Sequence, residues 1–345
     1  MDGYRRAMLG YLEEQPTDTV LPSIDSSVTV LHLHRDAFGR LSAPAVAAPE
    51  AVDVATSKRR TLEVAASLGI RVPRSLPVTS AAEVDAAVAE VGFPAVLKPD
   101  ESWLDLGGGG ERVNPVWLDG PEDAREAAAH LLPDGATALV QEVAPGLRET
   151  VKLFRHDGRW LARLVMTVDR SWPPLGGSSV MRATVAPPQD VLEAAERLVA
   201  EIGLEGYSEV EFRRGPDGEP LLMEVNPRLS QSVELAVRAG VDFPRMQLEW
   251  ARGGRIEPAS RYAVGVRVGR LAGEARLLAG SLLGSPPPRP RLAETAPAIA
   301  RDYLLRRARI EGLDLDDPKP VVGALAFTAR AVTRRGTRRP SPSPG

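Results

Sequence analysis

The stretch SEVEFRRGPDGEPLLMEVNPR, residues 208–228, decides the fold that we expect for this chain. Its first part, residues 208–213, alternates polar and apolar residues, which is the period of a half-buried strand. The alternation returns from Met223 to Asn226. The GPDG sequence at 215–218 is a strong hairpin signal. The stretch therefore predicts two antiparallel strands joined by a tight turn.

A two-residue loop at Asp217 and Gly218 would give this hairpin one polar and one apolar face. The expected cross-strand pairs are Glu211 with Glu224 and Glu209 with Asn226 on the polar face, and Val210 with Val225 and Phe212 with Met223 on the apolar face. A four-residue loop would slide the register by two residues without exchanging the faces. The apolar face is expected to face the core.

The two opposed carboxylates of the polar face point to a metal ion. Like charges directly opposite each other destabilise a hairpin, and a cation between them removes the repulsion. Oxygen ligands suit Mg²⁺, whose other positions are filled by water and phosphate; Mn²⁺ is the alternative ion. The competing interpretation is a solvated charged face. Arg228 favours the metal, because a guanidinium beside a metal–carboxylate cluster suits a phosphate.

With its Glu-x-Asn-Pro-Arg end, the hairpin resembles the metal-binding hairpin of the ATP-grasp superfamily. The resemblance implies an α/β (α+β) protein in which two α+β lobes grip ATP, preceded by a partial Rossmann-like segment. It implies that Glu211, Glu224 and Asn226 hold Mg²⁺ against the ATP phosphates. Arg228 would then clamp a phosphate or an intermediate.

Upstream segments extend the resemblance to the phosphate-binding side. A helix is expected from Ser57 to Leu68, and the resemblance assigns Lys58, at its start, to the nucleotide phosphates. The Gly-x-Pro-x-x-x-Lys pattern at 92–98 assigns Lys98, on a strand, to the α-phosphate. Four glycines follow at 107–110, where backbone N–H groups can approach phosphate oxygens. Gly108, Gly109 and Gly110 are therefore expected to cover the nucleotide, although such a run is also typical of a simple flexible loop.

The segment 138–146 resembles the hinge between the two ATP-grasp lobes, where adenine binds. Backbone groups around Glu142 and Ala144 would contact the adenine edge, and the expected contact set is Gln141, Glu142, Val143 and Ala144. Glu149 stands where family members often place a ribose-binding acid. Arg170 and Arg182 bracket a Pro- and Gly-rich segment that we expect to be a loop over the acceptor pocket. Two arginines suit a carboxylate substrate, so Arg182 joins Lys98 and Arg228 as a candidate catalytic residue.

The expected organisation has three parts. Residues 1–56 read as the second half of an α/β domain, with a helix at 2–14, strand-like pieces at 19–25 and 28–33, and an Ala/Pro-rich linker at 43–55. Residues 57–254 form the ATP-grasp domain, with lobes at about 57–138 and 139–254. Residues 255–345 form a C-terminal region that includes a linker-like kink at 285–290 and ends in a disordered basic tail at about 334–345.

Composition sets outer limits on the function. The 345 residues carry a net charge of −3, which argues against a general nucleic-acid binder. The absence of cysteine excludes disulfides, thiol nucleophiles and cysteine metal sites. The four histidines form no ligand motif, although His32 and His34 would share a strand face. No apolar run approaches the length of a membrane span, and no signal-peptide core is visible. A cytoplasmic protein without membrane or nucleic-acid partners is expected.

The resemblance to the ATP-grasp superfamily implies an ATP-dependent ligase that joins a carboxylate to an amine through an acylphosphate. ATP and Mg²⁺ are the expected cofactors, the substrates are a small-molecule carboxylate and amine, and a homodimer is compatible with the resemblance. Two alternatives stay open at this point: another phosphoryl-transfer enzyme on the same fold without an amine acceptor, and a non-catalytic ATP-binding protein.

Overall fold

The computed structural model describes residues 2–105, 110–132, 136–174, 176–215, 217–283, 290–313, 316–317, 319–320 and 322–323. The chain forms two compact units, which are described separately. The first comprises Met1–Thr167 and Val185–Ala263, and the second comprises Val168–Thr184 and Val264–Gly345. Strand β10 (Arg159–Trp172) carries the chain from the first unit into the second.

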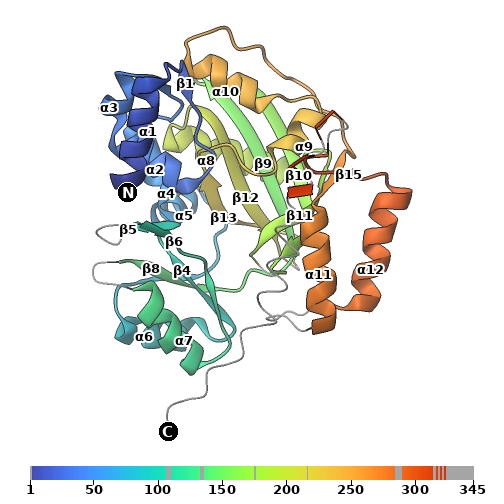
Figure 1. Cartoon of the computed structure of the whole chain (residues 1–345). Coiled ribbons are helices and arrows are strands. Elements are labelled where there is room, and N and C mark those ends of the chain that lie inside the picture. The colour runs from blue at the N-terminus through green and yellow to red at the C-terminus, as the bar shows by residue number, and fades with distance from the viewer. Residues whose placement is uncertain are drawn as a thin grey trace. The chain divides into compact units, whose positions relative to one another are not determined.

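The first unit contains a small antiparallel sheet with the strand order β3-β8-β4-β7. Its strands are β3 (Ser75–Val78), β4 (Ala95–Pro99), β7 (Val116–Leu118) and β8 (Ala138–Glu142). Helices α6 (Ala81–Val91) and α7 (Pro121–Leu131) lie side by side along this sheet (Figure 1). Leu97 packs with both helices in one core cluster. Because side chains alternate along a strand, Lys98 points to the other face of β4.

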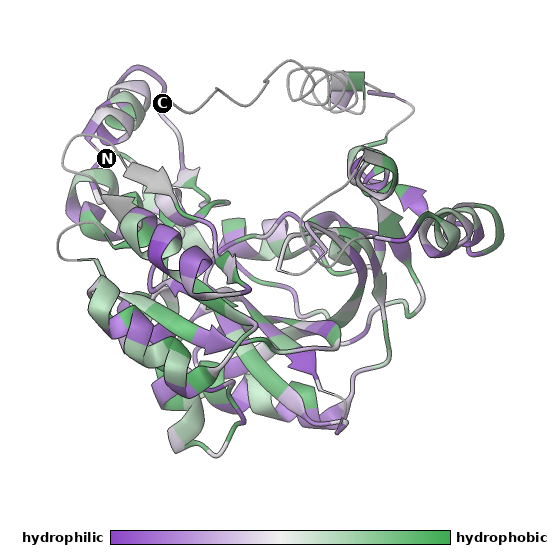
Figure 2. Cartoon of the chain, turned by 90° about the horizontal axis from the view of Figure 1, so that it is seen from below, coloured by the Kyte–Doolittle hydropathy of each residue, from purple (hydrophilic) through white to green (hydrophobic). Residues whose placement is uncertain are grey.

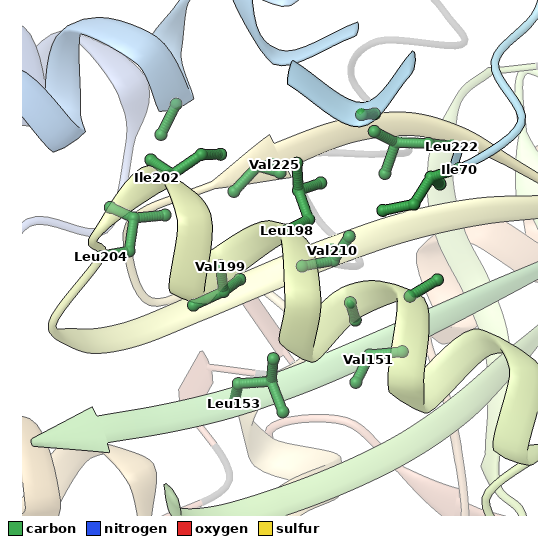
Figure 3. Packing of buried hydrophobic residues seen from close by; sticks show 14 of the residues in the cluster. Ile70, Val151, Leu153, Leu198, Val199, Ile202, Leu204, Val210, Leu222 and Val225 are labelled. Atoms are coloured by element: carbon green, nitrogen blue, oxygen red, sulfur yellow. The ribbon is translucent and has the colours of Figure 1, made fainter. Parts of the chain in front are cut away.

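A larger sheet in the same unit has the strand order β13-β12-β9-β10. Its further strands are β9 (Leu147–His156), β12 (Gly206–Arg214) and β13 (Pro220–Asn226). Helix α8 (Gln189–Ile202) lies across one face, where Leu198 and Val199 pack above Val151 and Val210 (Figure 3). This apolar packing leaves the opposite face of the sheet for polar groups.

The hairpin β12–β13 matches the expected register beside the acidic pairs and departs from it beyond them. Glu211 pairs with Glu224 and Glu209 with Asn226, as predicted. The register then shifts between Glu211 and Phe212, so that Phe212 faces Leu222. The predicted pairing with Met223 is therefore wrong, and so is the two-residue loop, since Arg214 pairs with Pro220. The irregularity inserts one extra residue into β13, and Leu222 takes the buried position expected of Met223.

The N-terminal segment contains more helix than the sequence indicated. Its elements are α1 (Asp2–Glu14), β1 (Thr19–Val20), α2 (Asp25–Leu33), α3 (Arg35–Gly39), β2 (Ala43–Pro44) and α4 (Pro49–Thr56). The expected strand at 28–33 is wrong, and His32 and His34 do not share a strand face. The expected linker at 43–55 is also wrong, because Ala51, Val52 and Ala55 are buried in the main core. Burial of these apolar side chains stabilises a helix there despite the neighbouring prolines.

Helix α5, two short strands and two further helices also belong to the first unit. Helix α5 (Lys58–Ser67) begins after Ser57, whose hydroxyl accepts from the backbone N–H of Arg60. Two short strands, β5 (Trp103–Asp105) and β6 (Gly110–Arg112), pair with each other. Helices α9 (Val233–Arg238) and α10 (Phe243–Ala251) follow the hairpin. Asp157 and Gly158, both at positive φ, make the tight turn between β9 and β10.

The second unit is built on three paired strands and two longer helices. Its elements are β11 (Ser178–Thr184), β14 (Arg267–Gly269), α11 (Leu271–Leu283), α12 (Leu292–Ala300), a π-helical turn (Arg301–Leu305) and β15 (Arg309–Ile310). Strand β11 pairs antiparallel with β14, which pairs parallel with β15. Arg170 and Arg182 lie within strands β10 and β11, so the expected long loop from 170 to 182 is wrong.

Hydrophilic and hydrophobic residues alternate along most helices and strands of the chain (Figure 2). This is the pattern of elements with one buried and one exposed side. Among the described residues, none of the helices combines the length and the hydropathy that spanning a lipid bilayer requires. The expected tail at 334–345 and all but Pro290 of the expected kink at 285–290 lie outside the described residues.

Candidate functional site

The polar face of the hairpin brings two carboxylates together at its centre. Glu211 lies directly opposite Glu224, and both side chains are half-buried. Burial raises the pKa of Glu211 to about 7, the Arg148 guanidinium opposes the rise, and the Glu224 carboxylate adds to it. Arg148 approaches Glu211 at 3.6 Å. Arg148 is therefore a distant ion-pair partner of Glu211, and at this distance it does not neutralise the two opposed acids on its own.

Lys98 stands within the field of this acidic pair. Burial lowers the pKa of its ammonium to about 8, and the Glu224 carboxylate is the largest charge that acts in the opposite direction. The ammonium donates to Oε1 of Gln141 on the neighbouring strand β8. Gln141 in turn donates from Nε2 to the Ser75 hydroxyl over 2.9 Å. The small sheet thus holds a partly desolvated cation toward the hairpin carboxylates.

A chain of hydrogen bonds continues from Glu224 to the N-terminal segment. Asn226 donates to Oε1 of Glu224 over 3.2 Å, and Arg228 donates to Oδ1 of Asn226 over 3.0 Å. Arg228 also donates from Nε to Oδ1 of Asp25 over 2.5 Å. Asp25 is in the first turn of α2 and was not among the predicted site residues. The carboxylate of Asp25 fixes a guanidinium that sequence reasoning had assigned to a phosphate.

Lys58 is buried at the start of α5, with 8 % of its surface exposed. Its ammonium donates to the backbone oxygen of Asp100 over 3.1 Å and to the Ser102 hydroxyl over 3.2 Å. Asp100 also accepts from the Ser57 hydroxyl and from the backbone N–H of Arg59. Lys58 is the first residue of α5, and the N-terminus of a helix favours an anion.

The predicted adenine and ribose residues cluster around the end of β8 and the start of β9. Glu142 accepts from the backbone N–H of Arg74 over 2.9 Å, and Val143 and Ala144 follow it directly. Glu149 is buried and accepts from Nε of Arg214 over 2.8 Å. Its carboxylate is thus engaged within the chain, and the ribose role of Glu149 stays a prediction.

Two other groups of predicted residues lie outside the described residues or in the second unit. Gly108 and Gly109 lie outside the described residues, whereas Gly110 opens strand β6. Arg182 belongs to the second unit, where it is fully buried, donates to the Ser179 hydroxyl over 3.1 Å and forms an ion pair with Glu311. Arg170 pairs there with Glu274 and Asp302. The acceptor-site role of Arg182 stays a prediction.

Sequence reasoning missed a buried polar cluster next to the acidic pair. Lys152 is fully buried and donates to the Glu209 carboxylate and to the hydroxyls of Tyr207, Ser230 and Ser232. Burial alone would raise the pKa of Glu209, but the Lys152 ammonium lowers it to about 2. The one sequence signal for this cluster is a lysine inside an otherwise apolar strand run, VKLF at 151–154.

The residues at the hairpin fit a magnesium ion. They offer two carboxylates and one amide oxygen, and hard oxygen donors in small number are the ligands that Mg²⁺ takes when water and phosphate complete its shell. Within the described part of the chain, no three carboxylate or imidazole groups converge on one point. A metal held here therefore depends on a ligand for part of its coordination, as in a nucleotide-bound site.

Comparison with known proteins identifies the same fold and related enzymes. Residues 136–273 match the family model described as an ATP-grasp in the biosynthetic pathway with Ter operon. The carbamoyl phosphate synthase large chain of Pseudomonas syringae pv. tomato is 27% identical over 274 residues, which cover 74% of this chain and 25% of that protein. The D-alanine–D-alanine ligase of Ectopseudomonas mendocina is 28% identical over 211 residues, covering 56% of this chain and 64% of the ligase.

Solved structures agree on the fold. The L-amino acid ligase of Bacillus licheniformis superposes with a TM-score of 0.59 at 15% identity, covering 76% of this chain and 65% of that one. The biotin carboxylase domain of Hydrogenobacter thermophilus 2-oxoglutarate carboxylase, solved with MgADP, ADP and bicarbonate, gives a TM-score of 0.59 at 13% identity, covering 76% of this chain and 60% of the other. The predicted fold class is confirmed. The chain spans about a quarter of the carbamoyl phosphate synthase large chain that it matches.

Proposed function

Because the chain belongs to the ATP-grasp superfamily, we propose that it is an ATP-dependent ligase that joins a carboxylate to an amine. The proposal depends on one observation above the others: Glu211 and Glu224 face each other on the hairpin within the field of Lys98. Two acids and a desolvated lysine in one place suit the phosphates of a metal-bound nucleotide.

In the proposed reaction, a carboxylate oxygen of the substrate attacks the γ-phosphorus of ATP, and ADP leaves. An amine nitrogen then attacks the acyl carbon of the acylphosphate, and phosphate leaves. Phosphoryl transfer demands little covalent chemistry from the protein, so positioning and charge neutralisation carry the catalysis. The relatives' names, carbamoyl phosphate synthase and D-alanine–D-alanine ligase, are consistent with this class of chemistry.

Each residue of the site has a part in this proposal. Lys98 and Lys58 would neutralise phosphate oxygens, and Arg228 would hold the transferred phosphate or the acylphosphate. Glu211, Glu224 and Asn226 would hold the magnesium ion, which when bound supplies positive charge to the phosphate oxygens. The side chain of Asp25 would keep Arg228 in place while the substrates exchange.

The test is an ADP-release assay with ATP, Mg²⁺ and a panel of small carboxylates, each with and without a panel of amines. We expect ADP release that depends on one carboxylate and rises with one amine, together with the condensed product by mass spectrometry. ADP release that ignores every amine would favour a kinase-like enzyme. Absence of magnesium-dependent ATP turnover with any pair would contradict the ligase and favour a nucleotide-binding protein.

A further inference from the structure

A pocket borders the hairpin on the side of the N-terminal segment. Its wall includes Asp25 and Thr29 from α2, Lys58 from α5, the segment 101–103, and Glu224 with Asn226 at the end of β13. Its volume is about 460 Å³, part of which is open to solvent. The pocket therefore adjoins the proposed metal ligands and Lys58, next to the place where the acylphosphate would form.

The charge of the pocket wall is unbalanced toward the negative. Asp25, Glu101 and Glu224 contribute carboxylates, whereas Lys58 is the cation among the lining residues. Asp25 is ion-paired to Arg228, and Glu224 is a proposed metal ligand. Within the described part of the chain, Glu101 has neither an ion pair nor a hydrogen bond. Glu101 thus has no direct ion-pair partner among the described residues, although the Lys58 charge acts on it from within the same pocket.

A second polar group of the same wall also has no partner. The indole Nε1–H of Trp103 is buried and makes no hydrogen bond among the described residues. A buried donor without an acceptor costs free energy comparable to a lost hydrogen bond. Glu101 and Trp103 are two residues apart on one segment. The pocket wall therefore carries the Glu101 carboxylate, which can accept a proton, and the Trp103 indole N–H, which can donate a hydrogen bond.

We infer that this pocket binds the acceptor amine of the proposed ligase, with Glu101 as the base that takes the ammonium proton and Trp103 as the donor to an oxygen atom that the acceptor carries. The inference rests on the proposed function. An amine that is protonated in water is attracted by the unpaired carboxylate and cannot attack until it loses a proton. The proton passes from the ammonium nitrogen to a Glu101 oxygen. The neutral nitrogen then attacks the acyl carbon, the bond from that carbon to the phosphate oxygen breaks, and the second N–H proton leaves with the phosphate.

The surroundings of Glu101 suit this role. The Glu101 side chain keeps an exposed surface, yet desolvation by its neighbours and the charge of Asp100 raise its pKa. Lys58 lowers it, Asp53 raises it and His32 lowers it. A carboxylate whose pKa lies closer to neutrality is a better base at physiological pH. The amine-dependent rate of the wild-type enzyme should therefore fall as pH drops through a raised Glu101 pKa, and this limb should be absent when Glu101 is glutamine.

Hydroxylamine separates proton removal from the rest of the reaction. It is largely unprotonated near neutral pH, so it can capture an acylphosphate without a base, whereas ethylamine and ethanolamine arrive as cations. We would measure ADP release and product with each of the three nucleophiles for the wild type, Glu101→Gln and Trp103→Phe. The matched control is Glu90→Gln, an exposed carboxylate of α6 that does not line the pocket.

The inference predicts that Glu101→Gln keeps the hydroxylamine rate within about twofold but loses about 10²-fold of the alkylamine rate, the size of a general-base effect. The loss should shrink as pH rises and free amine becomes abundant. Trp103→Phe should abolish the preference for ethanolamine over ethylamine.

Equal loss with hydroxylamine and alkylamines, or no loss with either, would overturn the inference while leaving the ligase intact. If the wild type released no ADP with any nucleophile, the ligase itself would fail and this inference with it. Thermal unfolding of each variant confirms that the pocket variants are folded.

Discussion

Glu209 and Glu211 lie two residues apart on β12 and point to the same face, yet their surroundings are opposite. Glu209 is buried against Lys152 and accepts from the hydroxyls of Ser230 and Ser232. Glu211 faces Glu224, and its ion-pair partner among the residues that the structure describes is Arg148 at 3.6 Å. The pKa of Glu209 is lowered to about 2, and that of Glu211 is raised to about 7.

From this difference we infer that Glu209 is a structural carboxylate and propose that Glu211 is a binding carboxylate. The chain supplies an ammonium and several hydroxyl donors for Glu209, so this buried charge ties β12 to the serines that follow Arg228. For Glu211 the chain supplies a second acid instead of a full partner. Displaced pKa values of this kind, caused by burial and a like charge, are typical of functional sites. We propose that an external cation binds between Glu211 and Glu224.

The largest effect is expected at the structural carboxylate. Lys152→Met leaves the Glu209 charge buried without its cation, and removal of one partner of a buried pair costs about 3–5 kcal/mol. Urea denaturation monitored by circular dichroism measures the change. The double variant Lys152→Met/Glu209→Gln should recover part of the loss, because the amide is neutral and can still bond the serine hydroxyls. A cost below about 1 kcal/mol for the single variant would show that Lys152 is not what stabilises Glu209.

Next in size is the effect of the binding carboxylates on turnover. Glu224→Gln removes the charge of a proposed metal ligand and should lower kcat by about 10²–10³-fold, the size of one lost electrostatic contact in a transition state. Its free energy of unfolding should stay level or rise, since the repulsion with Glu211 is gone. The control is Glu219→Gln, an exposed residue in the turn of the same hairpin. Wild-type turnover in Glu224→Gln would refute the ligand role.

The pH dependence of stability should have opposite signs at the two glutamates. The pKa of Glu211 is raised in the folded protein above its ordinary value of 4.5, so its contribution is present at acid pH and is lost as pH rises toward about 7. Without Mg²⁺ we expect the wild type to lose about 1–2 kcal/mol relative to Glu211→Gln between pH 5 and 8. Saturating Mg²⁺ with ADP should reverse the loss.

At Glu209 the lowered pKa contributes stability above pH 4.5 that is lost as pH falls toward about 2. Acid denaturation of Glu209→Gln and Glu211→Gln, compared with the wild type, checks both signs. Parallel pH profiles for the two variants would mean that the surroundings of the two glutamates do not differ as described.

The smallest effect is expected from the contact that holds Arg228. Asp25→Asn keeps an oxygen acceptor for the guanidinium but removes its charge, and charge-assisted hydrogen bonds are about twice as strong as neutral ones. We expect kcat to fall about 3–10-fold with KM for ATP nearly unchanged, because Arg228 would act on the transferred phosphate. Steady-state kinetics with the identified substrates measure the split. A rise in KM for ATP alone would place Arg228 on the nucleotide instead.

Local patterns predicted the hairpin but could not predict what depends on distant residues. Alternation along 208–213 places Glu209 and Glu211 on one face whatever the turn, so this part was accurate. The extra residue in β13 leaves the alternation of each half of the strand intact. The sequence pattern therefore does not reveal that Leu222, and not Met223, lies opposite Phe212. The β-branched run at 28–30 favours a strand, yet burial of Val28 and Val30 overrides that preference in α2.

Long-range partners explain the remaining differences. Arg228 and Asp25 are 203 residues apart, and no periodicity links them. Arg182 bonds with Glu311 across 129 residues, in a region for which the sequence predicted no structure. The sequence does not distinguish an arginine that is paired within the chain from one that is free to bind a ligand. Only the folded chain shows which arginines contact a carboxylate.

The central claim is that Glu211, Glu224 and Asn226 hold a divalent cation that carries the phosphates of a nucleotide. Calorimetric titration of ADP into the protein with saturating Mn²⁺, a probe for Mg²⁺, tests it directly. The wild type should bind with metal-dependent affinity, and Glu211→Gln/Glu224→Gln should bind at least 100-fold more weakly while keeping its fold, a difference of about 2.7 kcal/mol. Equal affinity in the two proteins, or binding that ignores the metal, would contradict the account.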